Sequence, residues 1–339
     1  MCGVPYHALD AYLYRLVQKG YKVAIAEQVE DPKLAKGLVK REVIRVVTPG
    51  TITSVQALDE TKNNYLMAVV YTGNNYGIAT VDITTGDFFV TEVTSERALL
   101  DEINKFTPSE LVCNEALFMS GLDMDELKER YHFAVTALEN RFFSDDDCRK
   151  ILKEHFHVMS LEGLGLGDYE NGMIASGAVL QYLYETQKND LSHLTKITPY
   201  TTGQFMMIDT STRRNLELVE TLREKQKRGS LLWVLDKTKT AMGARLLRSF
   251  IEQPLIDKEE IERRQQAIEE LNMNYISREE IREYLNSVYD LERLMGRISY
   301  KTANPRDLLS FKNSLEMLPY IKDILGEFSC ELLKKMNED

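Results

Sequence analysis

The chain has 339 residues, of which 43% are hydrophobic and 28% are charged, and its formal net charge is −11. This length predicts about two or three domains, and the 12 Phe, 17 Tyr and 13 Met exclude wholesale disorder. The apolar runs are far shorter than the roughly 18–20 residues of a membrane span, and no export signal opens the chain. We therefore expect a cytoplasmic protein. The four cysteines form no CxxC pair, which argues against a zinc site or a disulfide framework.

The charge is divided unevenly along the chain. Subtracting Asp and Glu from Lys and Arg gives +3 for residues 1–50, −14 for 51–194, +6 for 195–250 and −6 for 251–339. A net charge of −11 taken alone argues against a nucleic-acid partner. The basic stretches at 1–50 and 195–250 weaken that argument, because a whole-chain charge is a poor guide to local partners.

Residues 1–50 have the pattern of a mixed α/β unit. Leucines on one helical face precede Gly20, which ends the helix. Two strand-like runs follow, at residues 22–27 and 39–47, and Thr48-Pro49-Gly50-Thr51 then forces a turn. One helix and two strands make a small core for an independent domain. We therefore expect the chain to begin inside a domain.

Residues 64–155 have the order of a ribonuclease-H-like α/β layer. Three β-rich runs are separated by hairpin turns, and then helix and strand alternate. The expected strands are residues 65–71, 76–83, 87–93, 110–113 and 133–138, and the expected helices begin at Ser95 and Ser144. A glycine-rich stretch from Gly163 to Gly172 is predicted to be a flexible loop before a helical run at 176–186.

From Asp209 onward the pattern is helical throughout. Asp209 is predicted to cap a helix over residues 210–224, and Ser230 one over 231–236. Ser277 has capping-box spacing. Further helix starts are expected at Thr240, Asp257 and Asn304. The chain ends within charged helical sequence, so we expect the helical domain to be incomplete.

A ribonuclease-H-like order raises a metal-dependent nuclease as the alternative function. That chemistry needs clustered carboxylates around two metal ions. The first strand, residues 65–71, contains no acid, and Asp82 and Asp87 flank a hairpin, where Asp is common. We therefore disfavour the nuclease and expect no metal site. No G-x-x-x-x-G-K-[ST] loop occurs, so we also expect no ATP site in this chain.

The first basic group is the candidate DNA-binding surface. Lys36 and Lys40 lie beside a turn, and Arg41 and Arg45 lie on the second strand. Strand alternation predicts that Arg41 and Arg45 share one face with Val43 between them. Cations in this arrangement suit DNA phosphates, which give salt-dependent affinity without sequence preference.

A second basic group, residues 213–228, contains Glu217, Glu220 and Glu224. We interpret these glutamates as ion-pair partners of the Arg and Lys residues on one helix, so this group is predicted to be a solvated helix face.

The third basic group is small and lies within the acidic segment. Arg149, Lys150 and Lys153 share one side of a predicted helix. A solvated helix face is the ordinary interpretation, and a docking surface for a protein partner is the sharper alternative. The acids Asp145-Asp146-Asp147 are predicted to complement the positive end of the helix dipole.

Several motifs resemble the MutS family of bacterial DNA mismatch-repair proteins. Pro5-Tyr6-His7-Ala8 and residues 20–28 are similar to segments of the mismatch-binding domain, and residues 41–51 are similar to its end. Residues 209–217 resemble the opening of the helical core domain, which Met242-Gly243-Ala244-Arg245 continues. The resemblance covers essentially the whole chain in family order.

The resemblance implies a multidomain α+β and α/β fold. Residues 1–55 would be the C-terminal part of a mixed α/β mismatch-binding domain, 56–194 a ribonuclease-H-like connector, and 195–339 the N-terminal portion of an all-α core domain. The family's mismatch-wedging Phe-x-Glu motif, its DNA clamp and its ATPase domain would lie outside this chain. Phe250-Ile251-Glu252 matches the wedge motif by chance, because it falls in a core-domain helix.

The resemblance also implies function and partners. It adds Tyr6 and His7 to the candidate DNA contacts and makes the Arg149 face a candidate docking surface for the family's partner MutL. Mismatched double-stranded DNA would be the ligand, bound weakly by this chain. ATP, magnesium and dimerisation would belong to the full-length family proteins. We expect no cofactor and no catalytic site in this chain.

Overall fold

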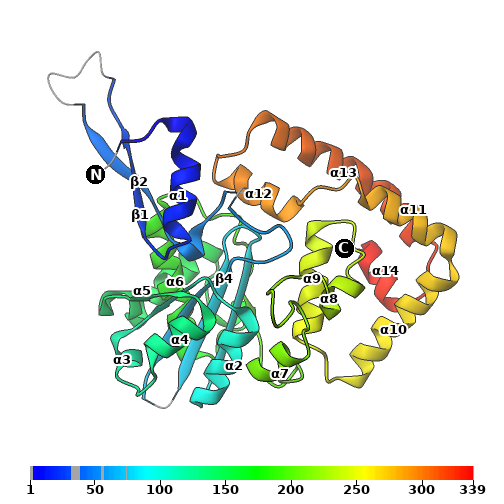
Figure 1. Cartoon of the computed structure of the whole chain (residues 1–339), viewed down its shortest axis with the longest axis horizontal. Coiled ribbons are helices and arrows are strands. Elements are labelled where there is room, and N and C mark those ends of the chain that lie inside the picture. The colour runs from blue at the N-terminus through cyan, green and yellow to red at the C-terminus, as the bar shows by residue number, and fades with distance from the viewer. Residues whose placement is uncertain (1–2, 32–38, 55–56, 74, 339) are drawn as a thin grey trace. The chain divides into compact units, whose positions relative to one another are not determined.

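The computed structural model (Figure 1) describes residues 3–31, 39–54, 57–73 and 75–338. The chain forms two compact units, one from Met1–Asp59 and Asn63–Thr201 and the other from Glu60–Lys62 and Thr202–Asp339. The first unit contains both sheets and helices, and the second is built from helices. The predicted mixed multidomain fold class is therefore confirmed, whereas the predicted domain boundaries stay predictions. None of the described helices is long and apolar enough to cross a bilayer.

A small helix-and-strand element opens the first unit. Helix α1, Leu9–Val17, ends before Gly20, whose φ of +81° suits glycine. Strand β1, Val23–Gln28, pairs antiparallel with β2, Arg41–Val47. The pairing skips Ile44, because Val43 lies opposite Ala26 and Arg45 opposite Ile25. A β-bulge of this kind interrupts the regular alternation of side chains along the strand.

The central sheet of the first unit has six strands in the order β7-β6-β3-β4-β5-β8. Strands β3, β4 and β5 form an antiparallel meander. Strand β6 pairs in parallel with β3, β7 with β6, and β8 with β5. Their bounds are β3 Leu66–Tyr71, β4 Tyr76–Asp82, β5 Asp87–Val93, β6 Glu110–Cys113, β7 Ala134–Ala137 and β8 Thr198–Pro199. The five predicted strands and the ribonuclease-H-like order are thus present.

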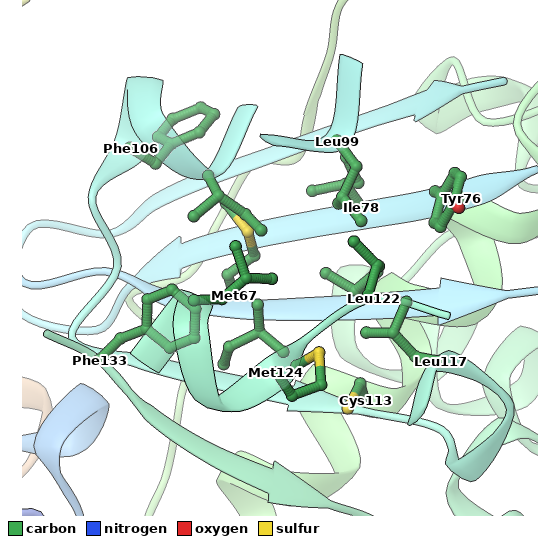
Figure 2. Packing of buried hydrophobic residues seen from close by; sticks show 14 of the residues in the cluster. Met67, Tyr76, Ile78, Leu99, Phe106, Cys113, Leu117, Leu122, Met124 and Phe133 are labelled. Carbon is green, nitrogen blue, oxygen red and sulfur yellow. The ribbon is translucent and has the colours of Figure 1, made fainter. Parts of the chain in front are cut away.

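Helices cover both faces of this sheet. On one face, Met67 and Ile78 pack against Leu99 and Phe106 of α2 and Met124 of α4 (Figure 2). The opposite face is covered by α6, which packs in turn against α5. The helix bounds are α2 Glu96–Phe106, α3 Glu115–Phe118, α4 Met124–Tyr131, α5 Asp145–Phe156 and α6 Glu170–Gln187.

Helix α6 begins earlier than the sequence predicts. Gly172 was expected in a flexible loop, but it lies in the first turn of α6. A Cβ atom at Gly172 would lie 2.8 Å from Cγ2 of Val90, and one at Gly177 would lie 2.4 Å from Cβ of Cys148. These glycines therefore allow close packing of the helix, which outweighs their low helix propensity.

The second unit is a set of helices with side-chain caps at most of the predicted starts. Ser230, Thr240, Asp257 and Asn304 each accept a backbone hydrogen bond from the first turn. The helices are α7 Thr210–Asn215, α8 Leu231–Leu235, α9 Ala241–Glu252, α10 Lys258–Met273, α11 Tyr275–Leu285, α12 Leu291–Ser299, α13 Pro305–Leu325 and α14 Glu331–Glu338.

Two predictions for this unit are wrong. The helix capped by Asp209 ends at Asn215 and does not continue to residue 224. Glu217 has a φ of +48°, and the backbone folds back so that the amide of Leu232 donates to the carbonyl of Leu218. Packing of Leu218 on Leu232 thus replaces further helix. Ser277 does not start a helix, because it lies inside α11.

Candidate nucleic-acid interface and the junction behind it

The predicted DNA-binding residues occupy different environments on the β1–β2 pair. Arg41 and His7 are exposed, and no ion pair or hydrogen bond to the Arg41 side chain is found among the described residues. Lys40 is exposed but pairs with Glu42 at 2.6 Å, and this hydrogen bond raises the pKa of Lys40. Lys36 lies outside the described residues, as does the side chain of Tyr6.

Arg45 does not share the surroundings of Arg41. Its Nε donates to Oε1 of Gln187 at 2.9 Å, and its Nη2 donates to the carbonyl of Thr51 at 2.9 Å. The prediction that Arg41 and Arg45 act together on one strand face rested on strict alternation, which the bulge at Ile44 interrupts. Arg45 therefore links β2 to the C-terminal end of α6.

The end of α6 makes two more bonds to β2. Nε2 of Gln187 donates to the carbonyl of Val46 at 3.3 Å, and Nζ of Lys188 donates to the carbonyl of Val43 at 2.9 Å. These bonds satisfy backbone oxygens on a strand whose other side already pairs with β1. Helix α6 thus holds the strand pair against the larger sheet.

A buried carboxylate completes this junction. The Glu110 side chain at the start of β6 is fully buried. Its Oε2 accepts from the hydroxyl of Thr48 and from the amide of Gly50 at 3.1 Å, and its Oε1 accepts from the hydroxyl of Tyr182 at 2.7 Å. Nζ of Lys22 lies 3.8 Å from Oε1. A buried charge needs such partners because desolvation is costly.

The junction also shifts the titration of its neighbours. Burial, followed by the charge of Glu110, raises the pKa of the Tyr182 hydroxyl. Burial lowers the pKa of Lys22, and Glu110 offsets part of that shift. Gly50 is needed here because a Cβ atom would lie 3.0 Å from Cβ of both Glu110 and Leu66. The turn predicted from Pro49 and Gly50 is thus a buried docking element.

The sequence does not predict the partners in this junction, namely Glu110, Tyr182 and Gln187. One signal was available for Glu110, since a charged residue opens a strand that is otherwise apolar. No local signal marks Tyr182 and Gln187. They lie in α6, which is buried on nearly all of its faces, so its sequence does not distinguish the face that contacts the junction.

The carboxylates considered for the nuclease hypothesis are held by protein donors. Oδ2 of Asp82 accepts from Asn63 at 3.0 Å and from the amide of Asn64 at 2.9 Å, and Oδ1 accepts from the amide and hydroxyl of Thr84. Asp87 accepts from Asn63 and Thr85. No cluster of three or more metal-ligating side chains occurs in the described part of the chain. This arrangement stabilises a turn and gives the nuclease hypothesis no support.

The basic face of α5 lies opposite its buried side. Cys148 and Leu152 are buried, whereas Arg149, Lys150 and Lys153 are exposed. Nε of Arg149 pairs with Oδ2 of Asp145 at 2.7 Å, one helical turn earlier. Lys150 and Lys153, in contrast, form no ion pair with another described residue.

The expected partners of the second basic group are different in the structure. Lys227 pairs with Asp236, and Arg213 lies 3.5 Å from Glu252. The Glu217 carboxylate instead accepts from the amide of Leu222 at 2.7 Å. The predicted pairing with Glu217 is wrong because residues 216–230 are not helical, so the one-turn spacing that it required is absent.

Comparison with known proteins covers the chain in three consecutive matches. Residues 1–56 match the family model of MutS domain I, residues 64–195 that of MutS domain II, and residues 211–338 that of MutS domain III.

Curated relatives match the chain over nearly its full length. It is 65% identical to the DNA mismatch repair protein MutS of Lachnoclostridium phytofermentans, over 100% of this chain and 36% of the relative. The MutS proteins of Ruminiclostridium cellulolyticum and Acetivibrio thermocellus are 52% and 48% identical, over 100% and 98% of this chain. The chain spans 39% and 38% of those two relatives.

Proposed function

This chain belongs to the MutS family of DNA mismatch repair proteins, and we propose that it carries the step between DNA contact and partner signalling in such a protein. The first domain would contact mismatched DNA through the exposed part of the β1–β2 pair. The connector would pass that contact on to the ATPase of the full-length protein and to MutL. ATP and magnesium would be bound elsewhere in the full-length protein. The protein would act in the cytoplasm.

The buried junction around Glu110 is the observation that carries this proposal. Three segments meet at one carboxylate, namely the turn after β2, strand β6 and helix α6. Arg45 and Gln187 add a second set of bonds between β2 and α6. A displacement of the β1–β2 pair on DNA binding would therefore also displace β6 and α6 of the connector, because packed and hydrogen-bonded elements move together.

DNA binding through Arg41 gives a direct test. We expect Arg41→Glu to weaken binding of a fluorescent duplex about fivefold at low salt, or about 1 kcal/mol, because a phosphate contact is replaced by repulsion. Fluorescence anisotropy over a salt series would measure the affinity and its salt dependence. We expect less than about a tenfold difference between matched and mismatched duplexes for this chain.

A matched control separates the site from general charge. Arg130→Glu makes the same charge change at an exposed position on α4 and is expected to leave binding nearly unchanged. Equal losses in the two variants would assign the effect to net charge. Unchanged binding by Arg41→Glu would remove the strand from the interface.

Partner docking on α5 is tested in the same way. We expect Lys150→Glu combined with Lys153→Glu to weaken MutL binding at least about fivefold, because both side chains are exposed and form no ion pair with another described residue. Biolayer interferometry with immobilised chain would measure binding of MutL in the absence of DNA. Lys334→Glu combined with Lys335→Glu, which makes the same charge change at exposed positions on α14, is the control and should leave MutL binding nearly unchanged. Wild-type affinity in the α5 variant would reject this face.

A further inference from the structure

The segment at residues 188–197 connects α6 to β8 within the first unit, and two histidines hold it by hydrogen bonds. Nε2 of His155, in the last turn of α5, lies 2.8 Å from the carbonyl oxygen of Leu194. His193 lies in the segment itself, and its Nε2 is 2.8 Å from the carbonyl oxygen of Ile83. These two histidines, which we call the histidine clasp, thus bind the segment to α5 and to the end of β4.

Both ring nitrogens of His155 are engaged while the ring is neutral. A carbonyl oxygen can only accept, so Nε2 carries the ring proton and donates it to Leu194. Nδ1 is then the acceptor for the hydroxyl of Tyr184 on α6, at 2.8 Å. A second proton would have to bind at Nδ1, where it would oppose the hydroxyl proton. The geometry therefore favours the neutral ring.

The surroundings of the clasp also disfavour a charge. His193 needs only one ring proton for its bond to Ile83, so its neutral form suffices. Both imidazole side chains are half-buried. The segment packs through three apolar side chains of which at most 4% is exposed, namely Leu191, Leu194 and Ile197. A positive charge on either ring would therefore be poorly hydrated.

The ionisable groups around the clasp come from α5, from the segment and from β4. Burial is the largest influence and lowers the pKa of both histidines. His157 adds to this lowering at His155, and His155 adds to it at His193. The carbonyl bonds and the Asp190 carboxylate oppose both shifts, and Asp82 opposes that of His193. Burial outweighs these opposing groups.

We propose that the histidine clasp makes the attachment of residues 188–197 sensitive to pH, so that the segment is released when the two rings are protonated. Released rings would titrate near about pH 6.5. Attachment is therefore strongest above that pH and weakens as the pH falls, because the released state binds protons first. Release would also free the end of α6, where Gln187 and Lys188 bind β2. This link would weaken in acid whether or not the strand pair contacts DNA.

Hydrogen exchange of the whole chain, followed by mass spectrometry at about pH 7.5 and about pH 5.5, tests the clasp. At the lower pH a released imidazole is protonated about ten times as often as it is neutral, so each ring can favour release by up to about tenfold. After correction for intrinsic exchange rates, we expect the protection of residues 188–197 to fall at least about tenfold. Unchanged protection would overturn the proposal.

A double variant assigns the pH response to these two rings. His155→Gln combined with His193→Gln removes both titrating groups and keeps an amide donor for each carbonyl. We expect its protection to differ less than about twofold between the two pH values. His132→Gln, at an exposed position after α4, is the matched control and should keep the wild-type response. A wild-type response in the double variant, or its loss in the control, would assign the effect to other groups and overturn the proposal.

NMR titration of the wild-type chain keeps the test valid if the double variant does not fold. The imidazole Cε1 protons would give the pKa values of His155 and His193 directly. Both should lie below the ordinary value of about 6.5. A pKa at or above that value for either histidine would overturn the proposal, because protonation of that ring would then not favour release.

Discussion

Replacing Glu110 by alanine is expected to lower the free energy of unfolding of the first unit by about 3 kcal/mol. The carboxylate is fully buried, and its loss leaves the hydroxyls of Thr48 and Tyr182 and the amide of Gly50 without their acceptor. Each unsatisfied buried donor costs about 1–3 kcal/mol. The expected total of about 3 kcal/mol is near the low end for three donors, because it assumes that some of them find new acceptors as the structure relaxes. Urea unfolding followed by circular dichroism would measure the loss.

Two further variants show whether the loss of stability comes from the broken hydrogen bonds or from the missing side-chain volume. Tyr182→Phe removes one donor and leaves the carboxylate with its other partners, so we expect a loss of about 1 kcal/mol. Glu115→Ala removes an exposed glutamate in the neighbouring helix α3 and should change stability by less than about 0.5 kcal/mol. Hydrogen exchange should also become faster in β2 of Glu110→Ala. A loss of less than about 1 kcal/mol in that variant would contradict a structural role for the carboxylate.

The strands of the large sheet could be predicted because local signals agree there with the final packing. Apolar runs such as β3 are buried on both faces, and Gly86, with a φ of +87°, lies in the turn that the sequence marks between β4 and β5. Helix caps were predictable for the same reason. Ser95 and Asn304 bond to their own first turns, and these bonds depend on residues close in sequence.

Other parts could not be predicted because contacts distant in sequence decide them. Glu217 is compatible with a helix, but packing of the following leucines ends α7 two residues earlier. Gly172 is a poor helix former that proximity to Val90 makes necessary. Tertiary packing overrides propensity in both cases.

The candidate DNA surface shows the same limit. Alternation placed Arg41 and Arg45 together, but a one-residue bulge separates their environments, and a helix more than 120 residues away in sequence supplies the Gln187 that binds Arg45. The sequence predicts a basic strand, but it cannot show which of the basic side chains on that strand form hydrogen bonds within the protein. Of these two arginines, Arg41 is the one that stays a candidate to contact phosphate.

The sheet and α6 approach so closely at Gly77 that one added methyl group should be severely destabilising. A Cβ atom there would lie 2.1 Å from the backbone carbon and 2.2 Å from the backbone oxygen of Asn171. Rotation of a side chain cannot relieve a clash with backbone. Strand β4 cannot move away easily either, because β3 pairs with it over Tyr76–Val81 and β5 pairs with it along its whole length. We expect Gly77→Ala to cost about 3 kcal/mol.

Thermal unfolding would show this cost as a decrease of about 6–12 °C in the midpoint, since 1 kcal/mol shifts a unit of this size by about 2–4 °C. Gly163→Ala is the matched control, because a Cβ atom at Gly163 meets nothing within 4 Å. That variant should be neutral or slightly stabilising, because alanine restricts the unfolded chain more than glycine does. If Gly77→Ala unfolded within about 2 °C of the wild type, α6 would not lie as close to β4 as the structure places it. The close contact of this helix with the sheet, on which the junction at Glu110 depends, would then be wrong.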